Sequence, residues 1–366
     1  MPDATTNADM LKSEIVSRVG TPAVVVDLDI VDRNIARTQA LCDAAGIRNR
    51  PHMKTHKNGG LARQQVKAGA IGVACQKLGE AEAMLDAGIE DILICYNILG
   101  AARSGKLADL LRRAPLKIAA DNAVSLAAYS EAGAAAGRPV DVLIECDTGR
   151  QRAGVVTPAE ALTLARIVRD DPHLTFKGLL LYPTGEDWPA AQRFLDETLA
   201  GLAELGLEAE IVSSGGTPNL AQLGALKGAT EHRAGTYIYN DRMMVTCGAA
   251  RQEDCALSVY TAVVSRAAPD RGILDAGSKT LTSDTGGGLD GYGFIVEYPD
   301  ARIAGFSEEH GMLDLSKTVD RPHIGEVVRV IPNHVCVVVN MVDRIVGVRD
   351  GRIEQIYKVD ARGQLV

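Results

Sequence analysis

The sequence predicts an α/β protein: a TIM-type (β/α)8 barrel followed by a C-terminal all-β domain. Short, nearly all-apolar runs alternate with stretches of helical periodicity through the first two-thirds of the 366 residues, and the pattern changes near residue 250. Strands buried on both faces of a parallel sheet read as continuous apolar runs. About eight such runs, each followed by a helix, are what a closed barrel requires. An open doubly wound sheet is the alternative.

The elements follow one another in a regular order. The expected barrel strands are 47–53, 71–75, 91–95, 116–120, 140–146, 177–182, 208–214 and 230–239. The expected helices between them are 59–68, 79–88, 101–113, 122–136, 157–170 and 189–205. An extra strand at 21–29 and a helix at 30–45 precede the barrel, and later strands are expected at 257–266, 272–276, 326–331 and 335–341. We therefore expect a barrel over 30–249 and a β-domain built from 1–29 and 250–366.

Composition and charge exclude several classes of protein. Hydrophobic residues make up 46% and charged residues 23% of the chain, which is typical of globular proteins. The net charge of −8, without a local cluster of Lys and Arg, argues against nucleic acid as a partner. No signal-peptide core and no long apolar span is present, which argues against a membrane. The seven scattered cysteines, none in a CxxC pair, indicate a reducing compartment, so we expect a cytoplasmic protein.

A lysine marks the end of the first expected barrel strand. The segment RPHMKTHK places Lys54 at the carboxyl end of this strand, where the active sites of barrels form. Partial desolvation and the neighbouring cations Arg50 and Lys57 favour the neutral amine that a Schiff base needs. A solvated basic loop is the alternative interpretation.

Two glycine-bearing loops follow the seventh strand and interrupt the eighth. Successive glycines let backbone N–H groups converge on an oxyanion, and neighbouring hydroxyls add donors. Loops at these two places are the habitual phosphate site of such barrels. The expected binding residues are Ser213, Gly215, Gly216, Thr217, Gly235, Thr236 and Tyr237. Together with Lys54 they predict a site for pyridoxal phosphate.

Several longer motifs carry a resemblance to a known family. They are TPAVVVDLD, RPHMKTHK, CQKLGEAE, ECDTGRQRAGV, SSGGT, HRAGTY, LDAGSKT, SEEHG and PNHVC. In this combination, over about residues 20 to 362, the chain resembles the D-threonine aldolase/D-serine dehydratase family. That family is similar to alanine racemase in its fold, a pyridoxal-phosphate barrel followed by a β-domain.

The resemblance implies roles for individual residues around the cofactor. Lys54 matches the lysine of the Schiff base, and Arg152 matches an arginine that faces the ring nitrogen of the cofactor. Arginine does not give up its proton, so the ring nitrogen would stay unprotonated. Tyr182 matches a tyrosine that lines the pocket, and Gln76 is expected near the ring. A surface ion pair is the alternative role for Arg152.

A histidine and a cysteine form the expected metal pair. His334 and Cys336 are separated by one residue on an expected strand, which puts both side chains on one face, about 7 Å apart. An imidazole and a thiolate suit a borderline ion such as zinc. The resemblance implies a metal at this position beside the cofactor, with manganese or magnesium as alternatives to zinc. Packing within a strand is the other interpretation.

The chain departs from its family near the substrate. Many members continue the tyrosine with His-Gly or Gln-Gly, whereas here Pro183 follows, in a loop that runs to Trp188. This loop therefore leaves the identity of the substrate open. Residues 282–291 are interpreted as a mobile lip or a Gly-rich hairpin, and His310 is expected near the site.

The resemblance implies a lyase dependent on pyridoxal phosphate and a divalent metal. The leading hypothesis is an aldolase that cleaves D-β-hydroxy-α-amino acids resembling D-threonine or 3-hydroxyaspartate. A dehydratase of D-serine or D-3-hydroxyaspartate is the alternative, followed by an amino-acid racemase and a non-enzymatic carrier of the cofactor. We also expect a homodimer in which residues 280–310 of one chain approach Lys54 of the other.

Overall fold

The structure, a computed structural model, describes residues 7–183 and 187–366. The chain divides into two compact units. The barrel unit comprises Arg37–Lys54, Asn58–Gly235 and Gln364–Val366, and the β unit comprises Met1–Ala36, Thr55–Lys57 and Thr236–Gly363. The chain therefore passes from one unit to the other after Ala36, Lys54, Lys57, Gly235 and Gly363.

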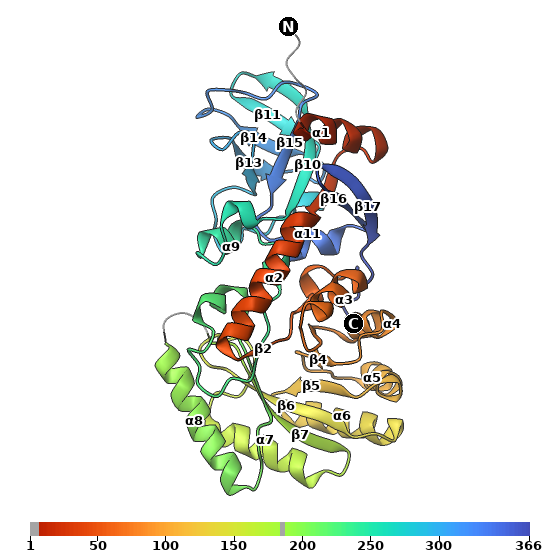
Figure 1. Cartoon of the computed structure of the whole chain (residues 1–366), viewed down its shortest axis with the longest axis vertical. Helices are drawn as coiled ribbons and strands as arrows, with labels where there is room; N and C mark the ends of the chain where they lie inside the picture. The colour runs from red at the N-terminus through yellow and green to blue at the C-terminus, as the bar shows by residue number, and fades with distance from the viewer. Residues whose placement is uncertain (1–6, 184–186) are drawn as a thin grey trace. The chain divides into compact units, whose positions relative to one another are not determined.

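Eight parallel strands make up the sheet of the barrel unit (Figure 1). In spatial order they are β2 (Arg48–Asn49), β9 (Glu231–His232), β8 (Ile211–Ser214), β7 (Leu174–Leu181), β6 (Val140–Cys146), β5 (Leu116–Ala120), β4 (Ile92–Ile94) and β3 (Val73–Cys75). The first and last strands of this order are linked by a parallel bridge between His52 and Ala74, which closes the ring. The predicted (β/α)8 barrel is therefore confirmed.

Helices follow most of these strands, as predicted. They are α3 (Gly59–Lys67), α4 (Leu78–Asp86), α5 (Ala101–Arg113), α6 (Ala123–Ala136), α7 (Pro158–Asp170) and α8 (Trp188–Glu204), while α2 (Leu28–Ala45) precedes the first barrel strand. Side chains that cap free N–H groups fix several starts: Asn58 begins α3, Asn122 begins α6, and Thr157 forms a capping box with Glu160 at α7. Only 3-10 turns, η2 (Thr217–Gln222) and η3 (Thr236–Ile238), follow β8 and β9, so the expected strand 230–239 is much shorter than predicted.

The interior of the barrel combines an apolar layer with a buried ion pair. Leu93, Ala119, Leu143, Leu180 and Ile211 form the apolar layer. Beside it the Arg50 side chain, 1% exposed, donates from Nε to both carboxylate oxygens of Glu231 at 2.9 Å. Arg50 also donates to Asp91 at 2.6 Å, and the Ser213 hydroxyl donates to Glu231 at 2.6 Å. Buried charges need such complete hydrogen bonding to be tolerated.

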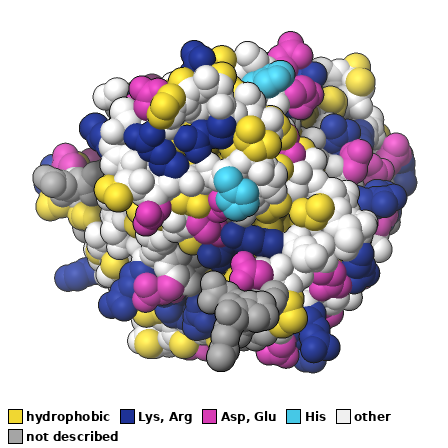
Figure 2. Space-filling model, turned by 90° about the horizontal axis from the view of Figure 1, so that it is seen from above, with side chains coloured by type: hydrophobic (Ala, Val, Ile, Leu, Met, Phe, Trp, Pro, Cys, Tyr) yellow, Lys and Arg dark blue, Asp and Glu magenta, His cyan; other side chains and the backbone are white. Residues whose placement is uncertain are grey.

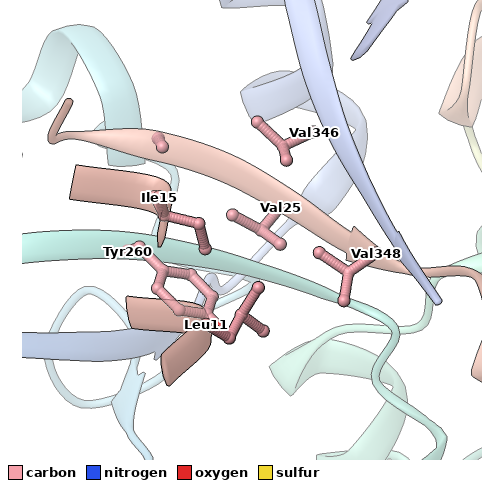
Figure 3. Packing of buried hydrophobic residues seen from close by; sticks show 7 residues of the cluster. Leu11, Ile15, Val25, Tyr260, Val346 and Val348 are labelled. Carbon is pink, nitrogen blue, oxygen red and sulfur yellow. The ribbon is translucent and has the colours of Figure 1, made fainter. Parts of the chain in front are cut away.

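The β unit contains a second, mixed sheet (Figure 1). Its strands are β1 (Ala23–Asp27), β10 (Leu257–Ala268), β11 (Arg271–Leu274), β12 (Phe294–Ile295), β13 (Arg302–Phe306), β14 (Gly311–Asp314), β15 (Val327–Ile331), β16 (Arg344–Arg349) and β17 (Arg352–Lys358). The N-terminal strand β1 lies between β10, to which it is antiparallel, and β16, to which it is parallel. Helix α1 (Asn7–Arg18) covers this part of the sheet: Figure 3 shows Leu11 and Ile15 packed against Val25, Tyr260 and Val348.

The expected strand at 335–341 is wrong. These residues form helix α11 (Val335–Met341). The β-branched composition favours a strand, but a short apolar run cannot be assigned by composition alone. Val335, Val338 and Val339 are buried at helical spacing, and the Asp241 carboxylate accepts a hydrogen bond from the N–H of Val335 at 3.1 Å. These contacts select the helix.

The surface carries charges of both signs. Figure 2 shows Lys and Arg side chains lying among Asp and Glu side chains on the displayed face. Among the helices of the described residues, none combines the length and hydrophobicity that a transmembrane span requires.

Candidate active site

Lys54 lies at the carboxyl end of the first barrel strand, as predicted from its place in the sequence. It belongs to the 3-10 turn η1 (Met53–Thr55) and its side chain is half-buried. Its backbone N–H donates to Nδ1 of His52 at 3.4 Å, so the proton of that imidazole lies on Nε2. This Nε2 then donates to the side-chain oxygen of Gln76 at 3.1 Å, and the Gln76 amide nitrogen donates to the Cys95 carbonyl at 2.9 Å. The chain of hydrogen bonds fixes both Gln76 and the backbone that carries Lys54.

The SSGGT loop (residues 213–217) packs its glycine backbone against two side chains. A Cβ atom on Gly215, where φ is +71°, would lie 1.9 Å from the His232 ring, and one on Gly216 would lie 2.6 Å from the Tyr182 hydroxyl. Only glycine fits at either position. The two glycines therefore allow the His232 ring and the Tyr182 side chain to pack directly against the backbone of this loop.

His232 supports this loop in its neutral form. Its Nε2 lies 3.0 Å from the Gly216 carbonyl, and because a carbonyl oxygen only accepts, Nε2 carries the proton. Burial lowers the pKa of His232 to about 4, with Arg233 contributing in the same direction. The second loop is tied to the first, since the N–H of Gly235 donates to the Thr217 hydroxyl at 3.2 Å. The two loops expected to hold phosphate therefore meet.

Arg233 is a residue that sequence reasoning did not assign. Its guanidinium is buried and donates to the Ser213 hydroxyl at 2.7 Å and to the Leu181 carbonyl at 2.8 Å. The Ser213 hydroxyl gives its own proton to Glu231, so Ser213 holds Arg233 in place. The HRAGTY motif contains Arg233, but a one-dimensional pattern does not show that this arginine becomes buried.

Arg152 and Tyr182 lie close to each other. The Arg152 guanidinium carbon is 5.7 Å from the centre of the Tyr182 ring, and that of Arg150 is 5.6 Å from it, both within cation–π range. The Arg152 side chain is exposed. Residues 184–186 of the following loop lie outside the described residues, so the substrate role expected for that loop stays a prediction.

His334 and Cys336 come together although they do not share a strand. His334 is the residue before helix α11 and Cys336 is its second residue, and their side chains are hydrogen-bonded. His334 Nδ1 also lies 2.8 Å from Oδ2 of Asp284. Burial lowers the pKa of His334, but the bond and charge of Cys336, together with Asp284 and Asp241, raise it to about 9. Metal binding there must therefore displace a proton.

Two hydroxyls approach the sulfur of Cys336. The Thr55 Oγ1 lies 3.2 Å and the Thr236 Oγ1 3.9 Å from this sulfur. Thr55 follows Lys54 in the chain and Thr236 follows Gly235, so each neighbour of an expected cofactor residue contacts the expected metal ligand. Sequence reasoning missed Thr55; its position beside Lys54 in RPHMKTHK was the available signal.

The donor set of this pair fits a metal ion that takes further ligands from elsewhere. Nitrogen and sulfur donors together suit zinc. Within residues 7–183 and 187–366, no three or more His, Cys, Asp or Glu side chains are grouped to hold an ion. His310 lies in an exposed turn between β13 and β14, where its carbonyl accepts from the N–H of Ser307.

An eight-stranded parallel barrel with a lysine at a strand end, two joined glycine loops and a separate β unit defines a pyridoxal-phosphate enzyme of fold type III. Sequence comparison agrees: the profile of the alanine racemase N-terminal domain matches residues 26–243, and that of a putative serine dehydratase domain matches residues 256–348. The chain belongs to the alanine racemase N-terminal domain family, and its relatives include lyases of D-amino acids.

Three relatives define the neighbourhood within that family. A D-threonine aldolase of Arthrobacter sp. is 35% identical over 364 residues, covering 95% of this chain and 94% of the relative. The crystal structure of D-threonine aldolase from Filomicrobium marinum is similar with a TM-score of 0.86 at 32% identity, covering 94% and 96% of the two chains. A cysteine-to-alanine variant of D-threo-3-hydroxyaspartate dehydratase, in the metal-free form, gives a TM-score of 0.82 at 30% identity, covering 93% and 97%.

Proposed function

We propose that this protein is an aldolase that cleaves D-β-hydroxy-α-amino acids with the help of pyridoxal phosphate and a divalent metal. One observation carries the proposal: the Cys336 sulfur, half of a His–Cys pair, lies 3.2 Å from the hydroxyl of Thr55, the residue after Lys54. Lys54, which would bond the cofactor, is thereby one peptide bond away from the residue that contacts the proposed metal ligand Cys336. D-threonine aldolases among the relatives support this reaction.

The chain's own residues fit the cofactor. Lys54 supplies the amine that bonds the aldehyde carbon, and the backbone of Gly215, Gly216 and Gly235, with the Thr217 and Thr236 hydroxyls, would hold the phosphate. Tyr237, Arg152 and Tyr182 complete the proposed binding set, and the chain through His52 and Gln76 orients the lysine backbone. When bound, the cofactor withdraws the electron pair left on the α-carbon as the Cα–Cβ bond breaks.

His334 and Cys336 would hold the metal. A divalent ion at this place supplies a Lewis acid for the β-oxygen of the substrate. The thiolate favours zinc over manganese or magnesium, because soft sulfur donors select softer ions. A related dehydratase with a cysteine-to-alanine substitution has a structure in a metal-free form, so metal binding is a property known within this group of relatives.

Lys54 has a second task. With cofactor and substrate bound, its Nζ would be able to hold a proton near the reacting carbons. In an aldolase this amine would give a proton to the α-carbon after the Cα–Cβ bond has broken, whereas in a dehydratase it would remove the α-proton. The same set of residues therefore serves either reaction, and the dehydratase relative at 30% identity makes it the second candidate.

We propose further that the enzyme is a cytoplasmic homodimer with twofold symmetry. None of the seven cysteines, all of which lie within the described residues, forms a disulfide bond, in keeping with a reducing compartment. Residues 280–310 of one chain would approach Lys54 of the partner, so that each β unit covers the cofactor of the other chain. An active monomer, measured by light scattering at micromolar concentration, would contradict the shared site.

A product assay separates the candidate reactions. The loaded enzyme is given D-threonine or D-threo-3-hydroxyaspartate, and products are resolved by chiral chromatography. Glycine with an aldehyde supports the aldolase, a 2-oxo acid with ammonia supports the dehydratase, and the L-isomer supports a racemase. Chelation with EDTA is expected to abolish turnover while the cofactor stays bound, and added zinc or manganese should restore it. Absence of turnover on every substrate would leave the carrier hypothesis.

A further inference from the structure

The imidazole of His334 has one nitrogen engaged by a carboxylate. Nδ1 of His334 and Oδ2 of Asp284 are 2.8 Å apart, and the two side chains are about equally exposed, 29% and 31%. An ionised carboxylate only accepts hydrogen bonds, so Nδ1 carries a proton. Nε2 is the nitrogen left for a metal.

Asp284 is itself held by the backbone around it. Its other carboxylate oxygen accepts from the N–H of Gly286 at 2.8 Å, and its carbonyl accepts from the Asn333 amide at 3.1 Å. Asn333 is buried, precedes His334 in the chain and also donates to the Gly291 carbonyl at 2.9 Å. Hydrogen bonds thus join residues 284–291 to the segment that carries His334.

We propose that Asp284 is a positioning residue for the metal pair: it fixes the proton of His334 on Nδ1 and turns Nε2 toward the ion. The inference rests on the proposed metal role of His334 and Cys336. A carboxylate on the distal nitrogen sets the tautomer and the orientation of a metal-bound histidine, and raises its basicity as a ligand. Removal of such partners weakens metal affinity about 10–100-fold in other proteins.

The substitution Asp284→Asn distinguishes a role in positioning the His334 ring from a role in stabilising the turn at Gly286. The asparagine oxygen can still accept from Gly286, which preserves the turn, while its NH2 group would then face His334 Nδ1. An amide N–H only donates, so Nδ1 would have to give up its proton and Nε2 would carry it instead. The nitrogen meant for the metal would be blocked.

Asp290→Asn is the matched control. Asp290 lies in the same turn and its side chain is 77% exposed, and it pairs with Arg302 at 2.7 Å rather than with a histidine. Both substitutions remove one negative charge from the segment. Only the substitution at Asp284 changes the partner of His334.

The test measures metal affinity of the pyridoxal-phosphate-loaded enzyme after chelation. Competition of zinc and of manganese against a chromogenic chelator gives the dissociation constants, and the visible absorbance checks that the cofactor stays bound. We expect a dissociation constant about 10–100-fold higher for D284N, and an unchanged one for D290N. Equal metal affinities of D284N and wild type would overturn the positioning role of Asp284 but would leave the proposed metal site unaffected. A wild-type enzyme that binds no metal would refute the proposed metal role itself.

A second measurement does not depend on the folding of a variant. Wild-type enzyme loaded with cadmium-113 and labelled with nitrogen-15 in its seven histidines gives the ring-nitrogen signals directly. The expected spectrum shows one histidine coupled to cadmium through Nε2 and protonated on Nδ1. Coupling through Nδ1 would contradict the role of Asp284.

Discussion

The hydroxyl oxygen of Thr55 lies 3.2 Å from the sulfur of Cys336. Thr55 follows Lys54 in the chain. A shift of the lysine backbone would therefore also move the hydroxyl that contacts Cys336, a proposed metal ligand. When Cys336 ligates a metal it is a thiolate, the Thr55 hydroxyl is then the donor, and hydrogen bonds to charged groups contribute about 1.5–3 kcal/mol. The contact is therefore strong enough to influence both metal binding and the reactivity of the thiol.

Thr55→Val removes this hydroxyl at nearly constant volume. We expect the thiolate of Cys336 to lose a donor, which weakens zinc binding by about 10-fold on the scale of such hydrogen bonds. Thr55→Ser keeps the hydroxyl and serves as the control. Titration of zinc against a chelator checks the result, and equal affinity for the valine and serine variants would show that the hydroxyl does not act on the sulfur.

Lys54→Ala should abolish turnover and the visible absorbance of the bound cofactor. The two lysines that would be examined next are engaged elsewhere: Lys57 is buried with Nζ 3.3 Å from the Ala361 carbonyl, and Lys279 pairs with Glu308 and Glu309 at 3.1 Å. Lys279→Ala is the control and should leave both properties intact. Yellow colour that survives dialysis of the Lys54 variant would place the covalent bond on a different residue.

Glu231→Gln should destabilise the barrel strongly. The Glu231 and Arg50 side chains are 0% and 1% exposed, so the substitution leaves a buried guanidinium without its principal counter-charge. The expected loss is about 3–5 kcal/mol of unfolding free energy. Urea denaturation followed by circular dichroism measures it. Replacing both residues, with Arg50→Met and Glu231→Leu, should recover much of the loss, and a single variant of wild-type stability would contradict the argument.

Acid should destabilise the protein through His232. Burial lowers the pKa of His232 to about 4 in the folded chain, while an unfolded histidine titrates near 6.5. As the pH falls below about 6.5 the unfolded chain binds a proton that the folded chain does not, so stability is lost progressively down to about pH 4. The contribution is about 3 kcal/mol in total. The difference in unfolding free energy between wild type and His232→Gln, measured at several pH values, isolates it; a constant difference would exclude His232.

The barrel could be predicted because its signal is repeated and local. Helix α5 begins and ends at the predicted residues 101 and 113, where apolar periodicity and a strand on either side leave little freedom. Helix α11 could not be predicted in this way. Its valines suit either a helix or a strand, and the first of them is hydrogen-bonded to Asp241, which lies 94 residues away in the sequence. The pairing of His334 with Cys336 was predicted on a strand geometry that is wrong, yet the two side chains meet at a helix start.

The site divides in the same way. Lys54 and the two glycine loops are placed by strand ends, which a sequence pattern locates. Arg233 and Asp284 depend on which distant groups surround them: a hydroxyl and a carbonyl from two other strands in one case, and a histidine 50 residues away in the other. Such partners have no periodicity of their own, so only the folded chain reveals them.

The repeated passage of the chain between its two units limits how the gene can be cut. A fragment of residues 58–235 alone would contain β3 to β9 but would lack β2 and Lys54. Its sheet would have two open edges where the native ring is closed. The two matched profiles leave a gap near residue 250. A cut there would put Thr236 and Asp241 on the N-terminal fragment, whereas their partners Cys336 and Val335 would lie on the C-terminal fragment. Split or domain-swapped versions of this enzyme must therefore exchange several short segments together, and proteolysis at any single loop should leave the halves associated.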